Sequence, residues 1–175
     1  RGPLVLSAIS QLLNDVAWGE LDVLVVDMPP GTGDAQLTMA QQVPLAGAVI
    51  VSTPQDLALI DARKGLNMFQ KVNVPVLGIV ENMSTFVCPH CGGRSDIFGH
   101  GGAKEEAAKL GIPFLGEVPL TMAVRETSDD GKPIVVSDPD SEVSKAYRGI
   151  ADTAWAEIEN APDGARAAPK IVMES

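Results

Sequence analysis

Two short stretches of the chain combine residue types that could do chemistry. Cys88 and Cys91 are the only two cysteines among the 175 residues. Their Cys-x-x-Cys spacing lets one turn direct both sulfurs at one ion, as zinc and iron–sulfur sites require. Asp27 ends an apolar run and precedes the loop Pro-Pro-Gly-Thr-Gly at 29–33. A carboxylate there is suited to Mg²⁺, and the glycines let backbone N–H groups approach a phosphate closely.

The cysteine pair leaves a ligand count to explain, because a tetrahedral site needs four ligands. His90 and His100 would complete a Cys₂His₂ zinc site, although His90 lies inside the turn and is poorly directed. A thioredoxin-type redox pair is another alternative, but such a pair normally begins a helix, whereas Gly-Gly follows this one. Two copies of Cys88 and Cys91 across a two-fold axis would also supply four thiolates.

The segment after Asp27 has alternative interpretations as well. It could be a tight glycine-rich turn, or part of a dinucleotide-binding fingerprint; Gln36 occupies the third glycine position of that fingerprint and argues against it. The phosphate loop G-x-x-x-x-G-K-[ST] does not occur, and the one Gly-Lys pair, Gly131-Lys132, is followed by proline. We therefore expect the phosphate loop of a nucleotide hydrolase to precede Arg1, with this chain inactive alone.

Two further polar residues lie at positions where a nucleotide would bind. Asp61 falls on the helix that follows the second predicted strand, as a surface acid or as a partner for a basic residue near the phosphates. Asn82 ends the third predicted strand, where its amide could read an adenine edge. Either residue could instead be a routine cap.

Strands and helices that alternate along the chain must position these residues. The pattern predicts an α/β fold, a parallel sheet flanked by helices, whose ligands bind beyond the carboxyl ends of the strands. The predicted strands are 21–27, 47–53, 74–82 and 112–120, and the predicted helices are 3–17, 34–43, one that begins at Thr53-Pro54, 101–110 and one that begins at Asp138-Pro139.

Composition narrows the function classes. The net charge of −10 argues against nucleic-acid binding, since phosphates would be repelled. No apolar run is long enough for a membrane span. Two closely spaced cysteines suit a cytosolic metal or redox site better than a secreted disulfide framework. We expect a cytoplasmic protein with one domain over 1–158, an insert at 83–100 that carries the cysteines, and a flexible tail over 159–175.

Several stretches together resemble the Mrp/ApbC-type P-loop ATPases of the MinD-like, deviant-Walker group. These are "WGELDVLVVDMPPGTGDAQLT", "VIVSTPQDLALIDARKG", "GIVENMSTFVCPHCGG", "IFGHGGA" and "LGEVPL…RETSDDGKPIV". The resemblance covers Arg1 to about Ile158, nearly the whole chain. It implies a P-loop NTPase-like fold whose first strand and Walker A loop are not in this sequence, and the function of an iron–sulfur cluster carrier or scaffold.

The resemblance also implies residue roles. Asp27 matches the Mg²⁺-side Walker B acid, and Asp61 matches the helix acid that contacts the signature lysine of the phosphate loop. The segment Gly31, Thr32 and Gly33 matches the switch near the γ-phosphate. Asn82 matches the adenine-reading asparagine and Pro119 the loop beside the base, while Cys88 and Cys91 match the pair that bridges a [4Fe–4S] cluster across a homodimer.

The resulting functional hypothesis is a cluster carrier that delivers [4Fe–4S] to apo iron–sulfur proteins, coupled to ATP and Mg²⁺. One alternative is a non-enzymatic, zinc-stapled dimer or regulatory module. Another is a MinD- or ParA-like positioning ATPase, which we disfavour because "ARAAPKIVMES" has two basic residues and only a weak apolar end.

Overall fold

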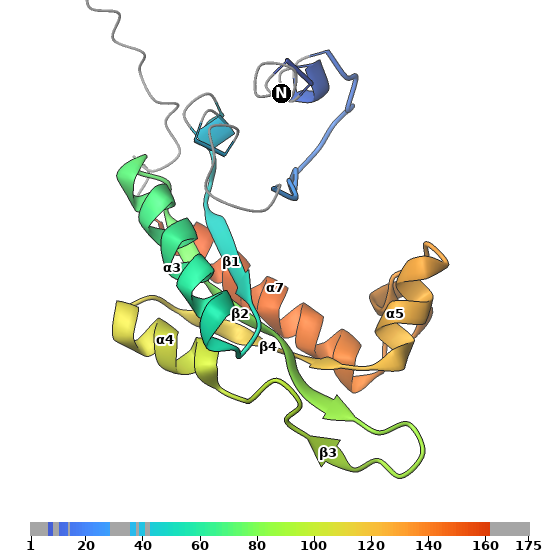
Figure 1. Ribbon diagram of the computed structural model, residues 1–175. Helices are drawn as coiled ribbons and strands as arrows, with labels where there is room; N and C mark the ends of the chain where they lie inside the picture. Colours follow the sequence, from blue (N-terminus) through green and yellow to red (C-terminus); the bar gives the residue numbers. More distant parts are fainter. Residues whose placement is uncertain are drawn as a thin grey trace, which may run out of the picture.

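The computed structural model describes residues 7–8, 11–13, 15–28, 36–37, 39–40 and 43–161. Its centre is a sheet in which β1, β2 and β4 run parallel, with β2 in the middle, and in which the short β3 pairs antiparallel to the far end of β2 (Figure 1). The predicted α/β fold with a parallel sheet flanked by helices is confirmed. The elements are β1 (Ala48–Ser52), α3 (Asp56–Lys71), β2 (Val76–Val87), β3 (Arg94–Ser95), α4 (Gly102–Leu110), β4 (Phe114–Leu120), α5 (Met122–Asp129), α6 (Ile134–Ser137) and α7 (Glu142–Asn160).

Helices cover both faces of the sheet. On one face, α3 and α4 pack against Ile50 and Ile79, and on the other, α6 and α7 pack against Val80 and Leu115 (Figure 1). Ile79 and Val80 are consecutive residues of β2 and point to opposite faces, as strand geometry requires. A strand buried on both sides explains why β2 reads as a continuous apolar run.

β2 is much longer than predicted and carries the chain beyond the sheet. The predicted strand 74–82 continues to Val87, and the register with β4 shifts between Asn82 and Phe86. Met83 lies in this shift with φ +56°, in the left-handed region that few non-glycine residues adopt. Beyond it, β2 and β3 form a hairpin that projects from the sheet (Figure 1). The predicted insert at 83–100 is therefore partly an extension of the central strand.

The predicted strand at 21–27 does not form. Residues 21–27 belong to no strand, and their apolar side chains are exposed, Val25 by 86%. A strand is held by hydrogen bonds to a neighbouring strand, and among the described residues no strand pairs with this segment. β1 pairs with β2 along one edge. The apolar run indicates that these side chains favour burial, but it does not determine which strand would pair with the segment.

Two predicted helix starts are also wrong. Helix α3 begins at Asp56 after Gln55, and Thr53 donates its hydroxyl to the Gln55 side chain at 2.8 Å, so it does not cap the helix. Helix α7 begins three residues after Pro139, because Ser141 accepts the backbone N–H of Ser144 and acts as the N-cap. Helices α5 and α6 were not predicted at all.

Some predictions fall partly outside the described residues. Residues 7–8 and 11–13 of the predicted helix 3–17 are helical, as are residues 36–37 and 39–40 of the predicted helix 34–43. Helix α7 extends to Asn160, and most of the predicted tail lies outside the described part. The division at residue 158 stays a prediction. Within the described chain, no helix has the length and hydropathy needed to cross a bilayer.

Candidate functional site

The cysteine pair lies in the turn between β2 and β3. Cys88 donates its backbone N–H to the carbonyl of Gly93 at 2.9 Å, and its own carbonyl accepts the N–H of Gly92 at 2.9 Å. Gly92 has φ +68°, which a side chain would strain. A Cβ on Gly93 would lie 3.2 Å from the sulfur of Cys91. The glycines after the pair thus close the turn and leave room for the sulfur.

The sulfurs are available for ligation. Both cysteines are free thiols, with Cys91 exposed and Cys88 half-buried. Hydrogen bonds from the backbone N–H groups of His90 and Cys91, and from the Cys91 thiol, lower the pKa of Cys88 below its usual range. This arrangement favours the thiolate, which is the form that binds metal.

No third protein ligand completes the site within one described chain. Among the residues that the structure describes, the one close grouping of three or more His, Cys, Asp or Glu side chains is Glu81, His100 and Glu117. Neither cysteine belongs to it. The structure therefore places His100 with two carboxylates and does not bring it to the cysteines, so the Cys₂His₂ zinc alternative gains no support from this grouping.

Of the residues predicted to bind nucleotide, the structure brings Asn82 and Pro119 together. Asn82 on β2 is the register partner of Val118 of β4, next to Pro119, and it lies where the regular parallel pairing of the two strands is interrupted by the register shift. Asn82 and Pro119 are both half-buried. The side-chain oxygen of Asn82 accepts the backbone N–H of Met83 at 3.0 Å. The carboxyl edge of the sheet is where ligands bind in open α/β folds.

The two predicted acids are both exposed. Asp61 is on the surface of α3 with its side chain 76% exposed, and it bonds Lys64 at 2.9 Å. Asp27 is exposed, in the segment that forms no strand. Gly31, Thr32 and Gly33 lie outside the described residues. The roles implied for these five residues stay predictions.

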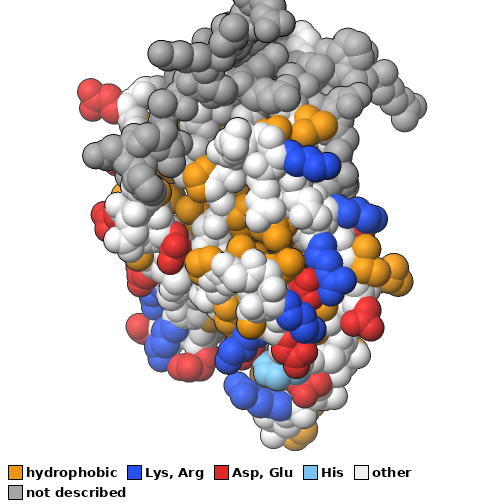
Figure 2. All heavy atoms as spheres, turned by 90° about the vertical axis from the view of Figure 1, so that its left-hand side faces the viewer, with side chains coloured by type: hydrophobic (Ala, Val, Ile, Leu, Met, Phe, Trp, Pro, Cys, Tyr) orange, Lys and Arg blue, Asp and Glu red, His pale blue; other side chains and the backbone are white. Residues whose placement is uncertain are grey.

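The surface on the side of α3 and α4 carries charges of both signs. On the side of α3 and α4, Lys and Arg side chains lie interspersed with Asp and Glu (Figure 2). Ion pairs on this side join Arg63 to Glu106 and Lys109 to Glu105. The Arg63–Glu106 pair links α3 to α4, and the hydrogen bond from Arg63 holds the pKa of the buried Glu106 carboxyl below its ordinary value.

Sequence reasoning missed Glu81. This residue of β2 is fully buried, and its two carboxylate oxygens accept the backbone N–H groups of Gly101 and Ala103 at 2.8 Å each. It therefore binds the N-terminus of α4 from the neighbouring strand. The signal was present, because one acid inside an otherwise apolar buried strand must have partners.

Comparison with known proteins identifies related chains. Residues 1–155 match a family model in the ParA group, described as "NUBPL iron-transfer P-loop NTPase". A protein of Arabidopsis thaliana named "Iron-sulfur protein required for NADH dehydrogenase, mitochondrial" is 61% identical over 86% of this chain and 48% of its own length. The "Iron-sulfur cluster carrier protein" of Escherichia coli K12 is 54% identical over 90% of this chain and 43% of its own.

A solved structure is similar too. It is described as a nucleotide-binding protein from Archaeoglobus fulgidus in complex with ADP, with cobalt found by PIXE. The likeness has a TM-score of 0.68 and 45% identity, and it covers 79% of this chain and 56% of that one. The chain spans about half the length of the curated relatives it matches.

Proposed function

Because the chain belongs to the family of NUBPL iron-transfer P-loop NTPases, we propose that the whole protein is an iron–sulfur cluster carrier whose cargo is held by Cys88 and Cys91. The observation that carries the proposal is the cysteine turn itself. Two free thiols share one tight turn at the end of a projecting hairpin, and one of them has a lowered pKa. Relatives named as cluster carriers support the same conclusion.

The proposed cargo is a [4Fe–4S] cluster shared by two copies of the chain. Such a cluster takes four thiolates, and each described chain offers two cysteines with no further ligand grouped beside them. A homodimer joined through the hairpins supplies the other two. The hairpin projects from the sheet, so two hairpins can meet without a clash between the cores (Figure 1).

Delivery is proposed to be coupled to ATP and Mg²⁺. Asn82 and Pro119 would border the base at the carboxyl edge of the sheet, with Asp27, Asp61 and the 31–33 segment serving the phosphates and Mg²⁺. The ADP described for the Archaeoglobus relative supports nucleotide binding. β2 joins the two sites directly, since Asn82 and Cys88 lie on one continuous stretch of chain. Apo iron–sulfur proteins would be the recipients.

The experiment is anaerobic purification of the full-length protein, with iron, sulfide and zinc assayed beside its mass in solution. We expect about two iron atoms per chain in a dimer, since one four-iron cluster is shared. Cys88→Ser and Cys91→Ser should each abolish iron binding and dimerisation, while His90→Ala, inside the same turn, should leave both intact.

Two outcomes would overturn the proposal. Zinc without sulfide that is lost, together with the dimer, in both serine variants would indicate a structural staple between two chains. Iron content that persists in both serine variants would place the cluster elsewhere. Coupling is tested separately: Asp27→Asn in the full-length protein should leave cluster content unchanged and slow cluster transfer to an apo-ferredoxin, and unchanged transfer would contradict the coupling.

A further inference from the structure

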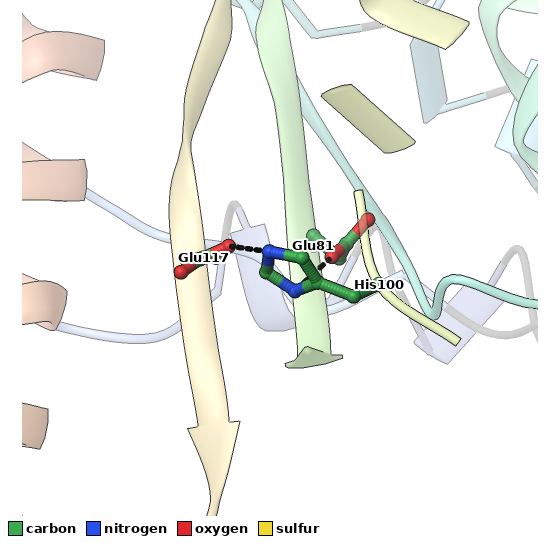
Figure 3. A group of neighbouring side chains, drawn as sticks. All are labelled: Glu81, His100 and Glu117. Atoms are coloured by element: carbon green, nitrogen blue, oxygen red, sulfur yellow. Dashed lines mark ion pairs between the residues drawn. The ribbon is translucent and has the colours of Figure 1, made fainter. Parts of the chain in front are cut away.

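A second cluster of ligand-type side chains lies away from the cysteines. Glu81 on β2, Glu117 on β4 and His100, just before α4, point toward one another (Figure 3). One ligand atom from each lies within 4.8 Å of the other two. The His100 ring lies between the carboxylates, with Nδ1 3.8 Å from a Glu81 oxygen and Nε2 3.8 Å from a Glu117 oxygen.

The fold positions the two carboxylates on one face of the sheet. Glu81 and Glu117 are register partners on adjacent parallel strands, so their side chains project from the same face. Glu81 is held rigidly, because each of its oxygens accepts one backbone N–H from the start of α4. A carboxylate oxygen has two lone-pair sites, so each oxygen of Glu81 keeps one for another partner.

The charge of this cluster is unbalanced. Neighbouring like charges on paired strands repel, and the Glu81 carboxylate has no exposure to water. Within the described part of the chain, neither glutamate forms an ion pair with a lysine or arginine, and His100 is the basic group that both face. The two backbone N–H groups at the start of α4 offset part of the Glu81 charge, and a divalent cation bound among the three side chains would offset the rest.

We propose that Glu81, His100 and Glu117 bind one divalent transition-metal ion of the zinc class. An imidazole nitrogen beside carboxylate oxygens is a donor set for such metals, whereas Mg²⁺ and Ca²⁺ prefer oxygen alone. Bond lengths of about 2.0–2.2 Å require the ligand atoms to approach one another more closely than they do here. The side chains of His100 and Glu117 are 44% and 48% exposed and are free to rotate inward onto the fixed Glu81.

The ion would act on the segment that leads from the cysteine hairpin into the sheet. His100 follows Gly99 and precedes Gly101, and both glycines have positive φ. A metal bond to His100 would join this glycine-flanked turn to β2 and β4 and restrict its motion. The site is independent of the thiolates, so a protein that binds no iron–sulfur cluster would still bind this ion.

The test uses the full-length protein with Cys88→Ser and Cys91→Ser, so that the thiolates cannot compete for metal. Zn²⁺ binding is measured by isothermal titration calorimetry, and we expect one Zn²⁺ per chain. His100→Ala and Glu117→Gln should each weaken Zn²⁺ binding at least about tenfold, as loss of even an outer-shell partner does. The matched controls His90→Ala and Glu105→Gln, at exposed positions outside the cluster, should bind as before.

Thermal unfolding gives a second readout that does not depend on the heat of binding. Saturating Zn²⁺ should raise the melting temperature of the double-serine protein, because an ion that binds the folded state stabilises it. The increase should disappear in His100→Ala, whose circular dichroism should match that of its parent. Absence of Zn²⁺ binding in the double-serine protein, or an affinity in both ligand variants that is unchanged from that of the double-serine parent, would overturn the proposal.

Discussion

Glu81 and Ala103 are joined by a buried hydrogen bond of 2.8 Å between a strand carboxylate and the first turn of a helix. The second oxygen of Glu81 bonds the N–H of Gly101, also at 2.8 Å. The central strand thus holds the start of α4 and the end of the segment that follows the cysteine hairpin. The Glu81 side chain therefore contacts two residues that lie 20 and 22 positions after it in the chain.

Removal of the Glu81 side chain should destabilise the folded protein. Glu81→Ala removes a charged acceptor from two buried N–H groups, and we expect the free energy of unfolding to fall by about 3 kcal/mol. Urea denaturation monitored by circular dichroism measures the change. Glu105→Ala is the control, since this exposed acid of α4 pairs with Lys109 at only 3.8 Å and should cost less than about 0.5 kcal/mol. Equal losses in the two variants would contradict the assigned role.

The Arg63–Glu106 pair predicts a pH dependence of stability. Arg63 Nη2 donates to Glu106 Oε2 at 2.6 Å, and this hydrogen bond lowers the pKa of Glu106 from its ordinary 4.5. A carboxyl with a lowered folded-state pKa stabilises the protein above its ordinary pKa, and the contribution is lost as the pH falls through the lowered value.

The variant Glu106→Gln should therefore be less stable than the wild-type protein at neutral pH. The difference in unfolding free energy between them should shrink as the pH falls below about 4. Urea unfolding at several pH values checks this. A difference that stays constant down to strongly acidic pH would show that the carboxylate charge of Glu106 contributes nothing.

Gly102 marks a close approach between the start of α4 and the segment before α3. A Cβ at this position would lie 2.5 Å from the carbonyl oxygen of Pro54. Gly102→Ala must force the two backbones apart, and we expect a loss of about 2 kcal/mol. Gly149→Ala, in α7 with nothing within 4 Å of its Cβ, should instead gain about 0.5–1 kcal/mol from helix propensity. The opposite signs separate a steric effect from a general intolerance of alanine.

The hydroxyl of Ser84 is buried with no hydrogen-bond partner among the described residues. It lies where the register between β2 and β4 shifts. Ser84→Ala should therefore be neutral or stabilise the protein by up to about 1 kcal/mol, since an unsatisfied polar group is removed. Ser144→Ala is the matched control. Ser144 is equally buried, but its hydroxyl donates to the carbonyl of Asp138 at 2.6 Å, so its loss should cost about 1 kcal/mol.

Local pattern was sufficient to predict the central fold. The apolar runs at 47–53, 74–82 and 112–120 correspond to β1, β2 and β4. For β2 the reason is burial on both faces, which leaves no polar face to interrupt the run. The same signal failed at 21–27, since a run of valines does not determine which strand will pair with it. The full length of β2 was not predicted, because the residues after Asn82 are less uniformly buried than those before it and do not continue the apolar run.

The candidate sites also differ in how far their residues could be predicted from local sequence. Cys88 and Cys91 are close in sequence, so a local motif was enough to predict that they share a turn. The grouping of Glu81, His100 and Glu117 spans 36 positions and depends on the β2–β4 register, which sequence spacing does not reveal. Asn82 was singled out by its place at the end of a predicted strand and Pro119 by resemblance, and the parallel pairing of β2 with β4 is what makes them neighbours.

The proposed reading of adenine by Asn82 is testable because this side chain has a structural contact as well. Its Oδ1 accepts the N–H of Met83, whose φ is +56°. Asn82→Ala in the full-length protein should weaken ADP binding about tenfold, the effect of one lost hydrogen bond, but it also removes this local support. Asn82→Asp separates the two roles, because it keeps the oxygen for Met83 and loses the amide donor. We expect Asn82→Asp to unfold like the wild-type protein and to bind ADP as weakly as Asn82→Ala. If Asn82→Asp binds ADP normally in a fluorescence titration, Asn82 supports the backbone at Met83 and does not read the base.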